Sequence, residues 1–420
     1  MTRRRFLKLG AAMAGAVLYG CEMSGKKNIK DFGKTFDYLS DPALRKKDMG
    51  DAQLVVDSAE FSGVKFQGQE WRNIKFVNCD FVGAYDIKQA LIAQSSFEGC
   101  KFAGIFNLGV LKQVRFERCL ISGSSHVVGD TGSLDVTFEQ CEQIGKDPEP
   151  NHWGSFGSYG EVAFIKCKAK WTNVTGETKH LIRDCDFESV DCSVSKDGGG
   201  SAVLIENSRL LGGFDMRPAT LLSLTIRDTT IEGTFNLTNA TVKGDILMER
   251  VTAGVILGYV KNANSLTVRD SKIIGNGMDV FEAFAGGIRA IAIEGTIFGA
   301  GSIRGGNGTD GVTIAGGFSL KDPTRTSNVS QSILIRDSKI PQLQSQHLNT
   351  KNLVLRKVEI GEADFTNTRA EVLELDDVSF TKSVNMSGAQ IKEFKQSGMT
   401  DLKRLGRSLK LEGSNIKLPR

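Results

Sequence analysis

Large apolar residues recur every five positions between residues 59 and 83. This stretch reads AEFSG VKFQG QEWRN IKFVN CDFVG, and its five pentads are centred on Phe61, Phe66, Trp71, Phe76 and Phe81. A period of five fits neither an α-helix, which repeats at 3.6 residues, nor a flat strand, which alternates every two. It predicts a chain that turns a corner after every five residues. Four such sides close a coil of about twenty residues.

The same unit returns at that interval along most of the chain. It has the form apolar-x-x-small-x-apolar, and successive units begin 18 to 26 residues apart. The first residues of the units are Val56, Phe76, Phe97, Phe116, Phe138, Phe164, Ile182, Ile205, Ile226, Met248, Val268, Ile293, Ile314, Ile335, Leu355, Leu375 and Phe394. This repeat predicts an all-β, single-domain parallel β-helix of about 17 coils, with ~20–22 residues in each, over residues 51–398.

The small position of the unit collects most of the cysteines. Six of the eight occupy it in consecutive coils, namely Cys79, Cys100, Cys119, Cys141, Cys167 and Cys185. No C-x-x-C spacing accompanies them, so a metal or redox array is not indicated. Parallel side-chain directions in neighbouring coils also suit disulfides poorly. We therefore expect a column of buried, unbridged thiols, which pack as compact apolar side chains.

Several pentads resemble those of pentapeptide-repeat proteins. CDFVG, CKFAG, CLISG, TTIEG and SKIIG are similar to the A-(D/N)-L-x-x unit of that family. The resemblance is close over residues 59–83 and intermittent to about residue 400. It implies a right-handed quadrilateral β-helix, and it implies a scaffold without a particular activity. A looser right-handed β-helix of the pectate-lyase type is the alternative.

Two adjoining export signals stand at the N-terminus. Residues 2–8 read TRRRFLK and resemble the twin-arginine signal S/T-R-R-x-F-L-K, in which the recognised residues are Arg3, Arg4, Phe6 and Leu7. The apolar run that follows is too short to cross a bilayer. The next residues, LYGC, resemble a bacterial lipobox, whose cysteine would become the lipidated first residue, Cys21. We therefore expect a signal peptide over residues 1–20.

Removal of that peptide changes the charge of the protein. The whole chain has 53 basic and 49 acidic residues, and four of the basic ones lie before Cys21. The mature chain is thus balanced at 49 of each, which gives no basis for nucleic-acid binding. The expected membrane attachment is through the lipid on Cys21. Glu22 after the cysteine favours the outer membrane over the inner membrane.

Both ends of the solenoid are expected to carry caps, because an open coil exposes core and strand edges. Residues 21–50 are interpreted as a lipidated tether followed by a short capping helix. Residues 399–420 are interpreted as a C-terminal cap. There Thr400 would start a helix whose leucines share one face, at Leu402, Leu405 and Leu409.

Insertions interrupt the coils near residues 142–161, 190–201, 276–288 and 299–332, and a binding site would lie there. The first insertion holds His152, Trp153, Phe156 and Tyr159, and Trp171 follows one coil later. These aromatic residues could stack on sugars, or they could fold back and plug the loop. No nucleophile–base arrangement, metal motif or cofactor motif accompanies them.

Two functions follow from these observations. The first is a non-catalytic, lipid-anchored β-helix of the cell envelope that acts as a structural or binding scaffold. The second is a carbohydrate-active β-helix, either a polysaccharide lyase or hydrolase or a glycan-binding protein. Because no set of acidic and basic residues aligns across consecutive coils, the sequence favours the scaffold. The partner would be an envelope protein or a glycan, and the oligomeric state stays undetermined.

Overall fold

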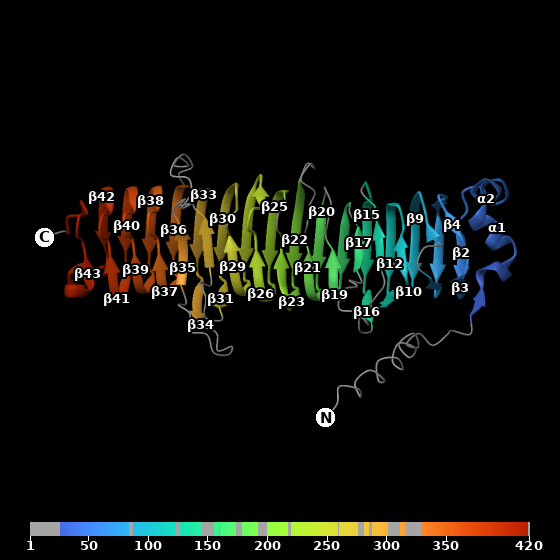
Figure 1. Cartoon of the computed structure of the whole chain (residues 1–420), viewed down its shortest axis with the longest axis horizontal. Helices are drawn as coiled ribbons and strands as arrows, with labels where there is room; N and C mark the ends of the chain where they lie inside the picture. Colours follow the sequence, from blue (N-terminus) through green and yellow to red (C-terminus); the bar gives the residue numbers. More distant parts are fainter. Residues whose placement is uncertain are drawn as a thin grey trace, which may run out of the picture. The chain divides into compact units, whose positions relative to one another are not determined.

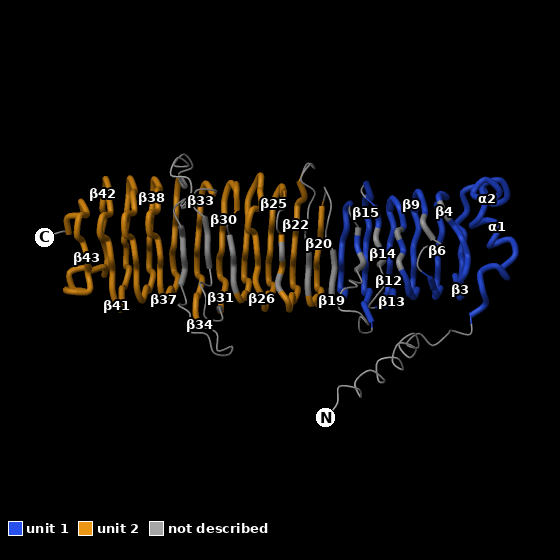
Figure 2. Tube along the Cα trace, viewed as in Figure 1, with its two compact units in different colours: residues 1–173 blue, residues 174–420 orange. Residues whose placement is uncertain are grey.

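The computed structural model describes most of the chain (Figure 1). The described residues are 26–83, 87–122, 126–130, 132–144, 155–158, 160–173, 179–191, 200–216, 220–258, 260–275, 281–284, 288–300, 311–315 and 330–418. They form two compact units, residues 1–173 and residues 174–420 (Figure 2). Each unit is an all-β parallel solenoid with few helices, consistent with the right-handed β-helix that the sequence predicts.

Unit 1 begins with a helical cap. It consists of the 3-10 helix η1 (Ile29–Phe32) and the α-helices α1 (Lys34–Ser40) and α2 (Pro42–Met49). The carboxylate of Asp41 starts α2 by accepting the backbone N–H groups of Ala43 and Leu44, at 2.9 and 3.0 Å. Leu39 is fully buried, and its carbonyl oxygen accepts the indole N–H of Trp71 at 3.1 Å. The cap therefore covers the apolar interior of the first coil.

The strands of unit 1 lie mainly on two parallel faces of the coil. The first face contains β2 (Leu54–Asp57), β5 (Glu70–Arg72), β6 (Ile74–Val77), β9 (Leu91–Glu98), β12 (Val110–Glu117), β15 (Leu134–Glu139) and β18 (Val162–Ile165). The other face contains β1 (Lys27–Asn28), β3 (Ala59–Ser62), β7 (Asp80–Val82), β10 (Lys101–Ala103), β11 (Ile105–Asn107), β13 (Leu120–Ser122), β14 (His126–Gly129), β16 (Glu142–Ile144), β17 (Ser155–Ser158) and β19 (Lys168–Asn173). The short strands β4 (Phe66–Gln67) and β8 (Ile87–Lys88) pair separately.

Unit 2 repeats this arrangement. Its first face contains β20 (Lys179–Arg183), β22 (Ser201–Glu206), β25 (Thr220–Arg227), β27 (Thr241–Val242), β28 (Asp245–Glu249), β30 (Ala263–Arg269), β33 (Ile288–Glu294), β36 (Ser330–Arg336), β38 (Asn349–Arg356), β40 (Arg369–Asp376) and β42 (Gln390–Ser397). Its other face contains β21 (Asp186–Asp191), β23 (Arg209–Leu210), β24 (Gly213–Asp215), β26 (Thr230–Asn236), β29 (Thr252–Gly258), β31 (Lys272–Gly275), β32 (Phe281–Phe284), β34 (Ile297–Ala300), β35 (Gly311–Ala315), β37 (Lys339–Gln344), β39 (Glu359–Asp364), β41 (Ser379–Asn385) and β43 (Leu409–Lys410).

The core of unit 1 is a column of stacked aromatic rings. In the parallel register Phe76 pairs with Phe97, Phe97 with Phe116, and Phe116 with Phe138. The ring centroids of these pairs are 4.8, 4.7 and 4.4 Å apart, and the ring planes are nearly parallel. All five pentad centres of residues 59–83 are buried. The inward column that the sequence predicts is thus confirmed in this unit.

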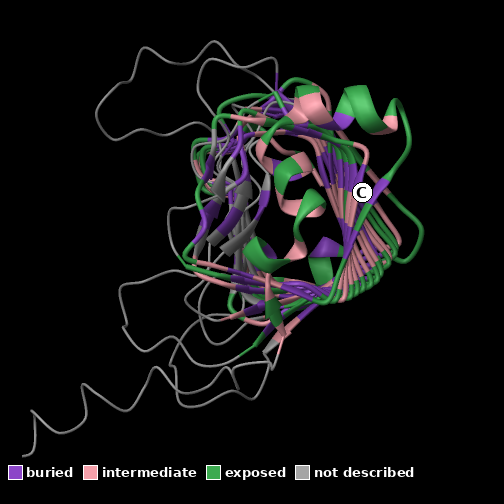
Figure 3. Cartoon of the chain, turned by 90° about the vertical axis from the view of Figure 1, so that its right-hand side faces the viewer, coloured by how far each residue is buried: buried purple, intermediate pink, exposed green. Residues whose placement is uncertain are grey.

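The core of unit 2 has the same columns with aliphatic residues. Ile205 pairs with Ile226, which pairs with Met248 and so on toward Leu375. Figure 3 shows buried positions alternating with intermediate and exposed ones along the strands. This alternation arises because successive side chains of a strand point to opposite faces. The apolar residues therefore occupy the inside of the coil and leave charged residues outside.

The number of coils is smaller than the sequence suggests. The described residues form about 12 turns, so the expected 17 coils is wrong. One predicted coil is absent altogether. Ile293 pairs directly with Ile335, whereas Ile314 lies in β35 on the other face. The strands β34 and β35 of the other face lie between Ile293 and Ile335, so this part of the chain belongs to one coil, in which Ile314 imitates the start of another repeat.

The C-terminal prediction also needs correction. Phe394 pairs with Leu373 rather than with Leu375, so the last unit was placed two residues too early. Thr400 does not cap a helix. Its hydroxyl accepts the N–H of Val378 at 2.8 Å, which makes Thr400 a member of the small-residue column. The helix that follows is the 3-10 helix η2 (Leu402–Ser408), and Asp401 caps it by accepting the N–H of Lys403 at 3.1 Å.

The segment after η2 partly closes the last coil. The carboxamide of Asn415 accepts the N–H of Ile391 at 2.8 Å and donates to its carbonyl oxygen at 2.9 Å. A side-chain amide thereby takes the place that the peptide group of a further strand would occupy. Such blunting of an edge strand reduces the risk of pairing with other chains.

Candidate functional site

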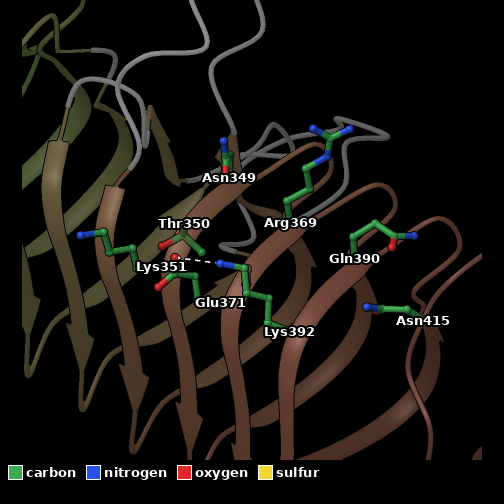
Figure 4. A pocket seen from close by; sticks show the side chains of 9 residues that line it. Asn349, Thr350, Lys351, Arg369, Glu371, Gln390, Lys392 and Asn415 are labelled. Atoms are coloured by element: carbon green, nitrogen blue, oxygen red, sulfur yellow. Dashed lines mark hydrogen bonds and ion pairs between the residues drawn. The ribbon is translucent and has the colours of Figure 1, made fainter.

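A polar hollow of about 480 Å³ lies at the start of the last three strands of the first face in unit 2 (Figure 4). Its lining comes from β38, β40, β42 and the C-terminal segment: Asn349, Thr350, Lys351, Arg369, Ala370, Glu371, Gln390, Lys392 and Asn415. Register brings these residues together. Asn349, Arg369 and Gln390 are direct neighbours across the strands although about 20 residues separate each from the next.

The hollow carries an excess of positive charge. Lys392 forms an ion pair with Glu371 at 3.2 Å between Nζ and Oε1, and Figure 4 shows these two side chains facing each other. Lys351 and Arg369 are exposed and point away from that pair. Gln390 donates to the carbonyl oxygen of Gly413 at 3.2 Å. The hollow thus offers cations and amides, which are suited to hydrogen-bonding a polar or anionic partner.

This arrangement has no obvious catalytic chemistry. The lining residues include no histidine or cysteine, and the hydroxyl of Thr350 donates to the carbonyl oxygen of Asn352 at 3.2 Å. General acid–base or nucleophilic catalysis needs a nucleophile within reach of a base. The cations and amides of the lining are suited to contact a polar partner.

A ladder of alternating charges covers the outer surface of the first face in unit 2. Its members directly follow the core residues and run in register through Arg183, Glu206, Arg227, Glu249, Arg269, Glu294 and Arg336. Neighbours form ion pairs. Arg183 lies 3.0 Å from Glu206, Arg269 lies 2.6 Å from Glu249, and Arg336 lies 3.1 Å from Glu294. These charges satisfy one another along the surface.

Glu249 is the most constrained acid of that ladder. Its carboxylate contacts Arg227 at 3.2 Å, Arg250 at 2.9 Å and Arg269 at 2.6 Å, and its side chain is 11% exposed. Partial burial opposes ionisation, but the hydrogen bonds from Arg269 and Arg250 outweigh it and hold the pKa of Glu249 below its ordinary value. Glu249 therefore stays charged at neutral pH and serves the structure of the surface.

The six cysteines of the small-residue column are buried and unbridged, as the sequence predicts. Burial raises the pKa of the Cys119 thiol, and the hydrogen bond with the neighbouring Cys100 raises it further. Each thiol lies close to backbone carbonyl oxygens, as Cys119 does to those of Phe97 and Glu117, at 3.3 and 3.6 Å. Within the described part of the chain, no three histidine, cysteine or acidic side chains gather as a metal site.

The aromatic residues chosen from the sequence are only partly described. Phe156 lies in β17, paired with Val127, and Trp171 lies in β19. His152, Trp153 and Tyr159 lie outside the described residues. The export and lipidation residues, Arg3, Arg4, Phe6, Leu7 and Cys21, also lie outside them. The structure therefore leaves the aromatic platform and the N-terminal signals as predictions.

Sequence reasoning missed both the hollow and the charge ladder. The ladder has a visible signal, because an Arg or Glu follows nearly every core residue of unit 2 in alternation. Reading that position down the repeat would have found it. The hollow has no such signal, since its lining residues belong to no motif and meet only through register. Its polar residues also alternate with apolar ones, which is the ordinary pattern of a solvated strand.

The fold and the hollow define a parallel β-solenoid with a polar, positively charged surface site. No family model, no curated protein and no solved structure matches the chain. None of the described helices is long and apolar enough to span a membrane.

Proposed function

We propose that this protein is a non-catalytic, lipid-anchored scaffold of the bacterial cell envelope. In this proposal the twin-arginine route exports it, Cys21 carries the lipid, and a right-handed β-helix of the pentapeptide-repeat type displays surfaces for an envelope partner. The outer membrane is the proposed location. The observation that carries the proposal is the order of the two N-terminal signals, TRRRFLK followed by LYGC.

Two features of the coil support this reading. The buried thiols are unbridged, which suits a protein that folds in the reducing cytoplasm before export. The polar hollow of unit 2 gathers exposed cations without a nucleophile and a base. A partner with polar or acidic groups would fit it, and rigid strands on three neighbouring coils would hold the binding residues in place.

Fractionation of cells tests the anchor. The Cys21→Ser protein should leave the membrane fraction, because one cysteine carries all the proposed acyl chains and stable anchoring needs two or more such signals. Arg3→Lys combined with Arg4→Lys should leave the protein in the cytoplasm. Cys192→Ser removes a thiol outside the lipobox, and it should stay membrane-bound as the matched control. Continued pelleting of the Cys21→Ser protein after a high-salt wash would contradict the lipoprotein assignment.

A further inference from the structure

The cap of unit 1 contains a buried cation without an acidic partner. Arg45 lies in α2 and is 9% exposed. Among the described residues, its buried Nη1 atom has no hydrogen-bond partner, and its side chain forms no ion pair within 4 Å. Burying a charge without compensation is costly, so buried arginines are normally paired. An unpaired guanidinium at this position needs an explanation.

Arg45 is one of the residues that line a hollow of about 500 Å³ beside the first coils. Two other cations, Lys46 and Arg72, share the lining, with the acids Asp51 and Glu70. The carboxylate of Glu70 is already paired with Arg72, at 3.0 Å. Neither acid comes within ion-pair distance of Arg45. The lining thus has three cations and two acids, and one of the acids is already paired with Arg72, so the hollow has a net charge of +1 and favours an anion.

The size of the hollow and the charge of the cap narrow the class of anion. A volume of about 500 Å³ falls in the range of sites for organic ligands and exceeds what a bare ion fills. Residues 26–50 contain seven basic and four acidic residues. A guanidinium fork binds phosphate oxygens in pairs, so a phosphate ester suits Arg45. A lipid on Cys21 would also hold Lys26, five residues later, within ~18 Å of the membrane surface.

We propose that the Arg45 hollow binds the phosphate of a phospholipid headgroup in the membrane that carries the anchor. The guanidinium of Arg45 would hold two phosphate oxygens, and Lys46 would neutralise the remaining charge. Only the membrane context rests on the proposed lipid anchor. The chemistry of the site depends on Arg45 and Lys46 and not on the anchor, so the two proposals can fail separately.

Calorimetry and thermal unfolding of the full chain with Cys21→Ser test the site without a bilayer. The probe is dihexanoyl phosphatidylglycerol below its micellar concentration, and inorganic phosphate is the second probe. The lipid should bind and raise the melting temperature. Arg45→Gln should weaken that binding at least tenfold. Lys47→Gln removes a nearby helix charge outside the hollow, and it should change the affinity less than twofold.

The unliganded variants distinguish the site from an internal ion pair. Without lipid, Arg45→Gln should keep or raise the melting temperature, because it removes an uncompensated buried charge. If Arg45→Gln and Glu70→Gln lower it equally, Arg45 has a partner in the chain and the proposal is wrong. If inorganic phosphate binds with the same affinity as the lipid, the ligand is a free anion and the lipid assignment is wrong. Unchanged binding in Arg45→Gln, or no binding to the wild type, would also refute it.

Discussion

At the scale of single residues, the small position of the repeat does more than fill space. In unit 2 the hydroxyl of Ser208 donates to the carbonyl oxygen of Glu206 at 2.7 Å and accepts the N–H of Cys185 at 3.1 Å. It thus satisfies backbone groups at the corner between two strands, where the ladder is interrupted. Cysteines occupy this column from Cys79 to Cys185, and a thiol such as that of Cys119 makes the first of these contacts as a weaker hydrogen bond, at 3.6 Å to the carbonyl oxygen of Glu117. Either residue type fits because both side chains are short and both can donate.

The substitution Cys119→Ser tests this interpretation of the column. A hydroxyl at residue 119 can take the same two bonds that Ser208 makes, so the free energy of unfolding should change by less than about 1 kcal/mol. The larger side chain of Cys119→Leu should cost ~1–3 kcal/mol through overpacking. Urea unfolding measures both variants. A large loss in the serine variant would show that the column requires thiols.

The free energies of unfolding of the wild type and of Cys119→Ser should also depend differently on pH. The raised pKa of Cys119 means that the folded chain keeps a proton which the unfolded chain releases above about pH 8.5. The unfolded state then binds fewer protons, so the free energy of unfolding falls as the pH rises. Between pH 9 and 10 the wild type should lose ~1.4 kcal/mol more than Cys119→Ser. Parallel pH profiles of the two proteins would contradict a buried, protonated thiol.

At the scale of the elements, each coil turns at a residue with left-handed backbone angles. Asp337, Lys357 and Asp377 occupy this corner in consecutive coils, with φ of 49°, 49° and 53°. Gly398 follows with φ of 63°. The left-handed region costs most residues ~1–2 kcal/mol, and it costs glycine, asparagine and aspartate the least. The corners therefore add a backbone preference to the apolar requirement of the inward strand positions.

We expect Lys357→Asn to stabilise unit 2 by up to ~1 kcal/mol, because Lys357 is exposed and pays the left-handed penalty without a compensating contact. Gly398→Ala changes the same corner position in a later coil and should have the opposite effect on stability. A Cβ there would lie 1.9 Å from Oδ1 of Asp377, which accepts the N–H of Met399 at 2.8 Å. The free energy of unfolding of Gly398→Ala should therefore fall by ~1–3 kcal/mol. Denaturant midpoints measure both, and a gain for Gly398→Ala would exclude the assigned corner geometry.

At the scale of the whole molecule, charge is organised within each unit rather than spread at random. Basic and acidic residues are equal in number from Cys21 onward, and unit 2 arranges several of its arginines and glutamates as an alternating ladder. Exposed ion pairs contribute little individually, and a network contributes more when several charges share one partner. Glu249 is such a shared partner. The ladder also removes unpaired charges from this surface, and the hollow at β38, β40 and β42 keeps its exposed cations.

The Glu249→Gln variant should therefore melt at a lower temperature than the wild type at pH 7. Glu232→Gln breaks only the pair with Arg209, which joins two exposed side chains at 2.7 Å, so its effect should be smaller. Because the pKa of Glu249 is lowered in the folded state, its contribution is present above about pH 4.3 and is lost as the pH falls further. The difference in melting temperature between the wild type and Glu249→Gln should therefore shrink as the pH is lowered from 5 toward 3. A difference that stays constant over this range would assign the effect of the variant to packing.

The sequence by itself determined the class of fold and the inside of each coil. Inward side chains must be apolar and must recur once per coil, so the columns from Phe76 to Phe164 and from Ile182 to Leu375 can be read directly. It also placed the thiols of the small position, because that corner admits only short side chains. It failed at Ile314 and Phe394, where an insertion and the end of the coil imitate the repeat.

Only the tertiary structure decided what meets on the surface. Glu294 and Arg336 are 42 residues apart in the chain, and they form an ion pair because the intervening insertion leaves their coils adjacent. The hollow around Glu371 and Lys392 and the hollow at Arg45 are likewise formed by residues that are distant in the sequence and meet only in the folded chain. Outward-facing residues obey no packing rule that fixes their type. Their partners depend on register and on the cap, which local sequence patterns do not encode.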